Sequence, residues 1–115
     1  MSAAFLKKKN MLYRCLILEL ETFKAGDCYE DNESRVLPFS VPNNAENDVH
    51  VCVGACQSSG YAFAGMQYGY ECYCGNSLPD RSLHRPSSDC NMPCSGDDSQ
   101  MCGGYWRINI YPVGM

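Results

Sequence analysis

The distribution of apolar and polar positions predicts one helix in this chain. Valines and cysteines recur between Val49 and Cys56, directly after Asn47 and Asp48, either of which can cap a helix N-terminus. Gly60 is placed to end this helix in a left-handed cap. We therefore expect a helix that presents its cysteines and valines to the interior.

Other segments have the patterns of strands, turns and loops. Three segments predict strands: 26–31, 60–76 and 105–111. The middle segment is rich in glycine and aromatic residues and is expected to form two strands around a turn near Gly69. Prolines, asparagines and polar runs predict loops at 38–44 and 78–89 and a tight turn at 94–99.

The spacing of cysteines relates the helix to one of the strands. Cys72 and Cys74 lie two apart and share one face of a strand, while Cys52 and Cys56 lie four apart and share one face of a helix. One face can therefore be joined twice to the other, although spacing does not choose which cysteine pairs with which. Tyr73 lies between two inward cysteines and must point away from the helix, so we expect its ring to be exposed.

Eight cysteines from Cys28 to Cys102 indicate disulfides. An even, dense set of cysteines in a small domain is typical of oxidative folding outside the cytosol, and eight cysteines allow 105 pairings. Zinc is the alternative, but neither His50 nor His84 lies at ligand spacing from a cysteine pair. We expect disulfide bonds, no metal and no cofactor.

Charge narrows the classes of partner. The 88 residues from Cys28 onward suit one small domain and carry ten acidic side chains against four arginines and no lysine. Such an acidic domain lacks the positive surface that binds nucleic acid, heparin-like polyanions or anionic membranes. Neutral or basic partners fit better.

Residues 1–25 have a different character from the rest. Lys7, Lys8 and Lys9 precede an apolar run that Arg14 and Glu19 interrupt, which makes a poor secretory signal. The run is too short and too charged to insert into a membrane. A linker, a fragment of a neighbouring domain or a mispredicted start are the alternatives. Its Cys15, the ninth cysteine, is expected to be a spectator.

Catalysis within this chain is not expected. Asp97 and Asp98 are adjacent in a turn, whereas glycoside hydrolysis needs two carboxyl groups several ångströms apart across a cleft. No glycine-bracketed nucleophile accompanies Ser82, His84 and Ser87. Oxidised cysteines supply no thiolate nucleophile.

Several motifs together carry a resemblance to a known family. The motifs are Asp27-Cys28-Tyr29, Arg35-Val36-Leu37, Cys52-x3-Cys56, 60–65, 68–76, Cys94-Ser95-Gly96 and Cys102-Gly103-Gly104. In order and content this set resembles a WSC domain over residues 26–111, leaving 112–115 as a tail. The resemblance implies a small disulfide-rich α+β domain, similar to PAN/apple modules, with one helix packed on an antiparallel sheet. It also implies the pairs Cys28–Cys90, Cys52–Cys72, Cys56–Cys74 and Cys94–Cys102.

The same resemblance implies an extracellular module that binds a polysaccharide or another glycan, such as a cell-wall glucan. Sugars place their C–H faces on aromatic rings and their hydroxyls on carboxylates, amides and guanidinium groups. The candidate rings are Tyr68, Tyr70, Tyr73, Tyr105 and Trp106. The candidate polar partners are Gln67, Glu71, Asn76 and Arg107. The alternative is an extracellular module that binds proteins, because interfaces favour the same residue types.

One further motif concerns modification. Asn32-Glu33-Ser34 is an acceptor sequence for N-linked glycans, which requires a surface position and a secretory route. We expect Asn32 to be glycosylated.

Overall fold

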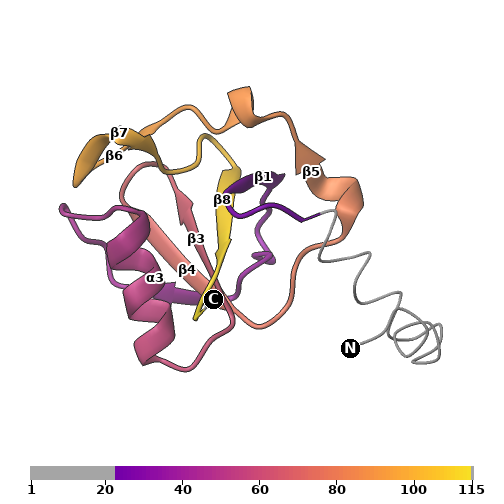
Figure 1. Cartoon of the computed structure of the whole chain (residues 1–115). Helices are drawn as coiled ribbons and strands as arrows, with labels where there is room; N and C mark the ends of the chain where they lie inside the picture. The colour runs from indigo at the N-terminus through magenta and orange to yellow at the C-terminus, as the bar shows by residue number, and fades with distance from the viewer. Residues whose placement is uncertain (1–22, 115) are drawn as a thin grey trace, which may run out of the picture.

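A computed structural model describes residues 23–114, in which one helix accompanies two antiparallel sheets (Figure 1). The elements are β1 (Asp27–Glu30), β2 (Phe39–Val41), α3 (Val49–Ser58), β3 (Phe63–Gln67), β4 (Glu71–Gly75), the 3-10 turn η1 (Arg81–Leu83), β5 (His84–Arg85), the 3-10 turn η2 (Ser87–Asp89), β6 (Pro93–Cys94), β7 (Asp97–Met101) and β8 (Arg107–Pro112). The predicted segment 1–25 lies almost wholly outside the described residues, as does Cys15. No helix among residues 23–114 is long and apolar enough to cross a bilayer.

The larger sheet has the strand order β2-β4-β3-β8-β1-β5, and β6 pairs with β7 in a separate hairpin. Every pairing is antiparallel. The predicted small disulfide-rich α+β fold is thus confirmed. Two predicted loops are wrong in part, because residues 38–44 contain the edge strand β2 and residues 78–89 contain β5 between two 3-10 turns.

Helix α3 begins and ends where its sequence predicts. The Asp48 carboxylate caps the helix by accepting a hydrogen bond of 2.8 Å from the Val51 N–H, and Gly60 follows the helix with a positive φ of 84°. Cys52 and Cys56 are buried against the sheet, but Val51 is exposed. The expectation that all the valines point inward is wrong at Val51, because neighbouring residues in a helix differ by about 100° in direction.

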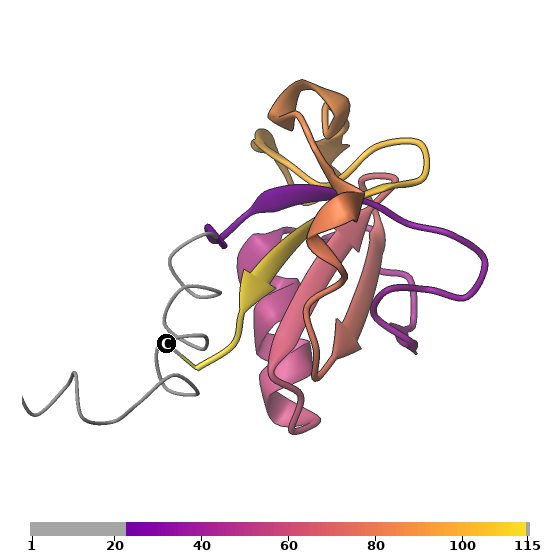
Figure 2. The same cartoon turned by 90° about the vertical axis from the view of Figure 1, so that its right-hand side faces the viewer.

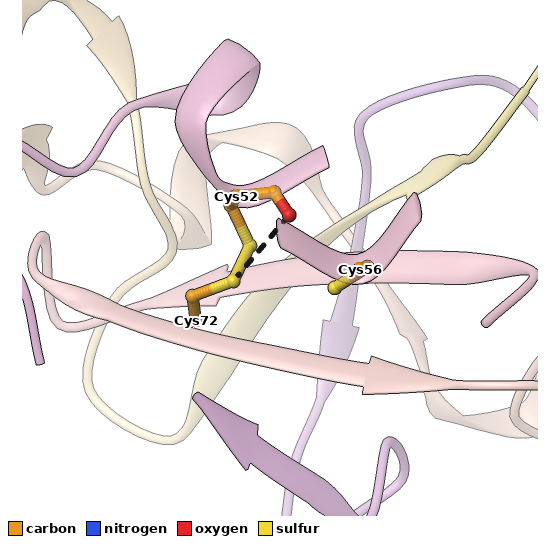
Figure 3. Close-up of side chains that lie close together, drawn as sticks. All are labelled: Cys52, Cys56 and Cys72. Atoms are coloured by element: carbon orange, nitrogen blue, oxygen red, sulfur yellow. Dashed lines mark hydrogen bonds between the residues drawn. A yellow bond between two sulfur atoms is a disulfide. The ribbon is translucent and has the colours of Figure 1, made fainter. Parts of the chain in front are cut away.

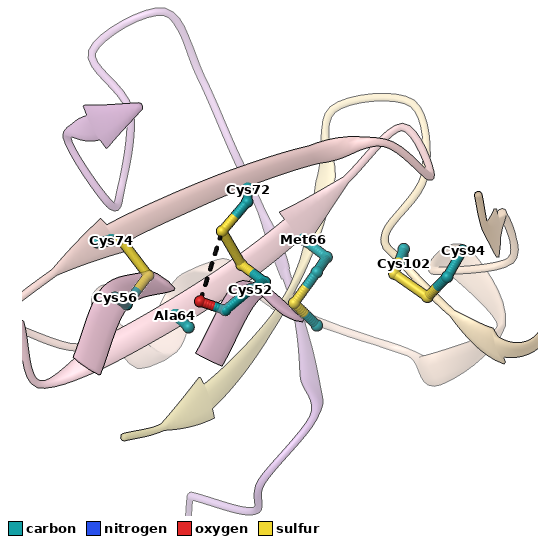
Figure 4. Packing of buried hydrophobic residues seen from close by; sticks show 8 residues of the cluster. All are labelled: Cys52, Cys56, Ala64, Met66, Cys72, Cys74, Cys94 and Cys102. Carbon is teal, nitrogen blue, oxygen red and sulfur yellow. Dashed lines mark hydrogen bonds between the residues drawn. A yellow bond between two sulfur atoms is a disulfide. The ribbon is translucent and has the colours of Figure 1, made fainter. Parts of the chain in front are cut away.

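Two disulfides join α3 to β4. Cys52 pairs with Cys72 and Cys56 with Cys74, around the buried side chains of Ala64 and Met66 (Figure 4). The sulfur atoms of Cys52, Cys56 and Cys72 lie within 4.8 Å of one another (Figure 3). Each of these sulfurs is held in a disulfide, whereas metal ligation uses thiolates.

The other two disulfides hold the outer segments. Cys28–Cys90 ties β1 to the residue that follows η2, and Cys94–Cys102 closes the β6–β7 hairpin. The four pairs are those that the family resemblance implies. Disulfides therefore join α3 and the segment after η2 to the sheet and brace the β6–β7 hairpin.

The face of the sheet opposite α3 is also buried. Residues 31–38 leave β1 and cover this face, as the purple loop on the far side of the sheet from the helix shows in Figure 2. Leu37 is 1% exposed and packs there with Ile108. Gly65 makes this approach possible, because a Cβ at Gly65 would lie 2.8 Å from Leu37 and 2.5 Å from Ile108. The domain therefore has a core on each side of its sheet.

Candidate binding face

Tyr73 points away from the helix as predicted, but its ring is buried. The side chain is 7% exposed and belongs to the core on the sheet face opposite α3, beneath the loop 31–38. The prediction of an exposed Tyr73 ring is therefore wrong, because the alternation of a strand fixes only the face and not what covers it. The Tyr73 hydroxyl donates a hydrogen bond of 3.0 Å to Glu71 Oε1.

Arg35 lies against Tyr73 and links it to the surface. The guanidinium carbon of Arg35 is 5.0 Å from the Tyr73 ring centroid and 4.8 Å from the Trp106 ring centroid. Both distances fall in the range of cation–π contacts. The sequence pattern around Arg35 did not indicate a binding role, because its two ring partners lie far away in the sequence.

Asp31 fixes the position of Arg35. One carboxylate oxygen of the buried Asp31 accepts from Arg35 NH1 at 2.9 Å, and the other accepts from the Val36 N–H at 2.9 Å. Burial lowers the pKa of Arg35, but the hydrogen bond to Asp31 and the nearby Tyr73 outweigh this effect and raise its pKa. The guanidinium therefore stays charged, with its charge balanced locally by Asp31.

A two-residue turn presents the most exposed ring of the face. Gly104 and Arg107 exchange two backbone hydrogen bonds, of 2.9 and 3.3 Å, which leaves Tyr105 and Trp106 as the turn. Tyr105 is 69% exposed and Trp106 is half-buried. The expected strand 105–111 consequently begins at Arg107, because the two aromatic residues form the connection and not the ladder.

Tyr68 extends the face on the side of the β3–β4 turn. Its ring meets the Tyr105 ring edge to face, with 5.8 Å between the centroids. Tyr70 lies in the same turn and is 44% exposed. We call Arg35, Tyr68, Tyr105 and Trp106 the aromatic face, and the buried Tyr73 ring supports it from beneath Arg35.

Backbone strain is concentrated in the aromatic face. Within residues 23–114, positive φ angles outside glycine occur at Arg35 (60°), Tyr68 (56°) and Trp106 (53°). Residues with side chains seldom adopt this left-handed region, and each such case costs on the order of 1 to 3 kcal/mol. Arg35 lies against the Trp106 ring, and Tyr68 lies against the ring of Tyr105, the residue before Trp106. Strained residues from three separate loops are thus linked by these contacts, a pattern that is typical of functional sites.

The other predicted polar partners are placed differently. Gln67 is fully buried. Asn76 follows the far end of β4, about 17 Å along the strand from Glu71, and accepts a hydrogen bond from the Ala62 N–H. Arg107 pairs with Asp89 at 3.0 Å. Arg107 Nη1 also donates to the Trp106 carbonyl at 3.1 Å, so Glu71 and Arg107 both adjoin the aromatic face.

The residues considered for catalysis have structural contacts. The Asp97 carboxylate accepts hydrogen bonds from the Ser99 N–H and hydroxyl and from Gln100, and these bonds lower the pKa of Asp97. His84 lies in the edge strand β5, with its Nε2 atom 3.7 Å from Asp27 Oδ2. Asp97 therefore stabilises its own turn.

Alkaline pH is expected to destabilise the fold through Tyr73. Burial, assisted by the hydrogen bond to Glu71, raises the pKa of Tyr73 from 10.0 to about 12. Between these values the folded state keeps the phenol proton while the unfolded state loses it, so the free energy of unfolding falls as pH rises through this window. Below pH 10 this contribution is fully present.

Denaturant unfolding at a series of pH values checks this expectation, with Tyr73→Phe as the control that lacks the ionisable group. Any alkaline cleavage of the disulfides affects the wild type and the variant equally, so it cancels in the comparison. An identical fall of stability in the variant above pH 10 would contradict the role given to Tyr73.

Comparison with known proteins places these features in a family. A sequence model of the WSC domain matches residues 26–104. A WSC domain-containing protein of Arthroderma benhamiae is 42% identical over 85 residues, which are 73% of this chain and 12% of that protein. Kremen protein 1 of Mus musculus is 38% identical over 88 residues, 73% of this chain and 18% of that protein.

A third relative is named as an enzyme. Xylosyltransferase oxt of Drosophila melanogaster is 38% identical over 90 residues, which are 76% of this chain and 10% of that protein. The chain thus spans between a tenth and a fifth of these relatives, and what they share with it is the small disulfide-rich domain. With its four disulfides and the match over residues 26–104, the chain belongs to the WSC domain family.

Proposed function

We propose that this chain is an extracellular, non-catalytic binding module that recognises a neutral polysaccharide through the aromatic face. The observation that carries the proposal is the strained backbone at Arg35, Tyr68 and Trp106. Arg35 lies against the Trp106 ring, and Tyr68 lies against the exposed ring of the neighbouring Tyr105. Its disulfides and its relationship to Kremen protein 1 and a fungal WSC protein support a role outside the cytosol.

The chemistry of the face suits an uncharged sugar chain. Tyr105 and Trp106 offer ring surface for the C–H faces of a sugar, and Arg35 and Glu71 lie beside them as hydrogen-bonding groups for hydroxyls. The positive charge of Arg35 is balanced by Asp31 and by the adjacent Glu71, so the face has no excess positive charge to attract a polyanion.

Replacing Trp106 by glycine is expected to weaken binding to the preferred polysaccharide about tenfold without unfolding the domain. The change removes the ring, while glycine adopts the left-handed backbone of this turn without strain, which offsets the lost contact with Arg35. Retention on insoluble β-glucan, chitin and mannan measures binding, and thermal unfolding measures stability.

Phe39→Ala is the matched control, because Phe39 is an exposed ring that stacks on Tyr61 away from the aromatic face. Loss of retention in Phe39→Ala together with full retention in Trp106→Gly would contradict the proposal and indicate that Phe39 and Tyr61 form the binding site.

A protein partner is the second candidate, favoured by the combination of Arg35 with exposed Tyr105 and Trp106, residue types that are frequent in interface hot spots. The dependence of binding on ionic strength distinguishes the polysaccharide from the protein partner. Binding of a neutral sugar is expected to change little with salt, whereas a basic protein attracted to this acidic domain would be released as salt increases.

A further inference from the structure

The turn that carries Arg35 contains the sequence Asn32-Glu33-Ser34, which is the single N-glycosylation acceptor motif of the chain. We propose that Asn32 carries an N-linked glycan and that this glycan leaves the domain at the Trp106 end of the aromatic face. The modification itself does not depend on the proposed polysaccharide binding.

The acceptor motif is accessible in the folded domain. Asn32, Glu33 and Ser34 are all exposed, although they lie between the buried Asp31 and the buried Leu37. The turn therefore projects its three acceptor residues into solvent while its two ends are held in the fold. A bulky, hydrated glycan fits such a position without displacing core side chains.

The hydrogen bonds of Asn32 leave its reactive atom available. Asn32 Oδ1 accepts from the Ser34 N–H at 2.9 Å, while the Nδ2 atom has no hydrogen-bond partner within residues 23–114. Glycosylation uses Nδ2: the bond from the sugar C1 atom to a lipid-linked pyrophosphate donor breaks, the C1–Nδ2 bond forms, Nδ2 loses one proton and the lipid pyrophosphate departs. The fold therefore loses no hydrogen bond when the glycan is attached.

Two backbone contacts place the glycan near Trp106. The Asp31 N–H donates to the Trp106 carbonyl at 3.0 Å, and Arg35 N–H donates to the Asn32 carbonyl at 2.9 Å. Asn32 thus follows directly after the residue that contacts Trp106, and it closes the turn that sets Arg35 against the Trp106 ring. A glycan on Asn32 therefore starts beside the Arg35 and Trp106 end of the aromatic face.

The test is to secrete the full chain from eukaryotic cells behind an added signal sequence and to compare intact masses before and after treatment with peptide N-glycosidase. Wild type and Ser34→Thr are expected to lose the mass of a glycan, and Asn32→Gln and Ser34→Ala to show no change. Ser34→Ala is the matched control, because it removes the hydroxyl of the acceptor motif but keeps the backbone N–H that donates a hydrogen bond to Asn32 Oδ1. Wild-type protein secreted with four disulfides and no glycan would overturn the proposal.

Trp106 reports where the glycan lies, because it is the single tryptophan of the chain. Acrylamide quenching of its fluorescence is expected to be weaker in the glycosylated wild type than in Ser34→Ala. Equal quenching in the two proteins would show that the glycan points away from the aromatic face and would overturn its placement.

Discussion

Replacing Tyr73 by alanine is expected to lower the free energy of unfolding by about 3 to 5 kcal/mol, as truncation of a large buried ring does in other cores. The ring is 7% exposed and packs among Leu37, Ile108 and Ile110. Its loss leaves a cavity and also removes one of the two rings that flank Arg35. Guanidinium-induced unfolding of the oxidised protein measures the effect.

Tyr73→Phe is the matched control for this prediction. It keeps the packing and removes only the hydrogen bond to Glu71, so we expect a loss of about 0.5 to 1.5 kcal/mol. A change below 1 kcal/mol in Tyr73→Ala would mean that the ring contributes little to the core. Such a result would restore the interpretation of Tyr73 as a surface residue.

Removing the disulfide Cys28–Cys90 by the double substitution Cys28→Ala and Cys90→Ala is expected to cost about 4 kcal/mol of stability. The cysteines are 62 positions apart, so the bridge closes a long loop and strongly restricts the unfolded chain. Both residues are buried, and the bridge holds β1 to the segment after η2. The unfolding midpoint of the purified variant measures the loss.

The Cys94–Cys102 pair provides the comparison, because it spans only 8 positions. Its removal is expected to cost about 2.5 kcal/mol on the same loop-entropy estimate. Equal losses in the two double variants, or a larger loss at Cys94–Cys102, would show that local packing outweighs loop length in this domain.

Local sequence patterns predicted the helix and its connection to β4. Asp48 and Gly60 mark the two ends of α3 by their capping chemistry, and the spacings within Cys52/Cys56 and Cys72/Cys74 require no knowledge of distant residues. The choice of partners for these cysteines came from the family resemblance, since the spacing allows Cys52 to pair with either Cys72 or Cys74 and Cys56 with the other.

Long-range packing set the features that the sequence did not predict. The face toward which Tyr73 points was correct, but its burial depends on Leu37, which belongs to a loop with no periodic pattern. Arg35 joins the binding face only because Asp31 and Trp106 hold it there. The short strand β2 was missed for a related reason: prolines flank it, and its ladder exists only through pairing with β4.

The two edge strands of the sheet decide how the domain can meet other chains. β2 has three residues between Pro38 and Pro42, and β5 has two residues before Pro86. Proline has no N–H to donate, and such short edges offer few backbone groups in register for an added strand. We therefore expect partners to contact side chains of this sheet without adding a strand to it, and neighbouring copies of the domain to keep their larger sheets separate.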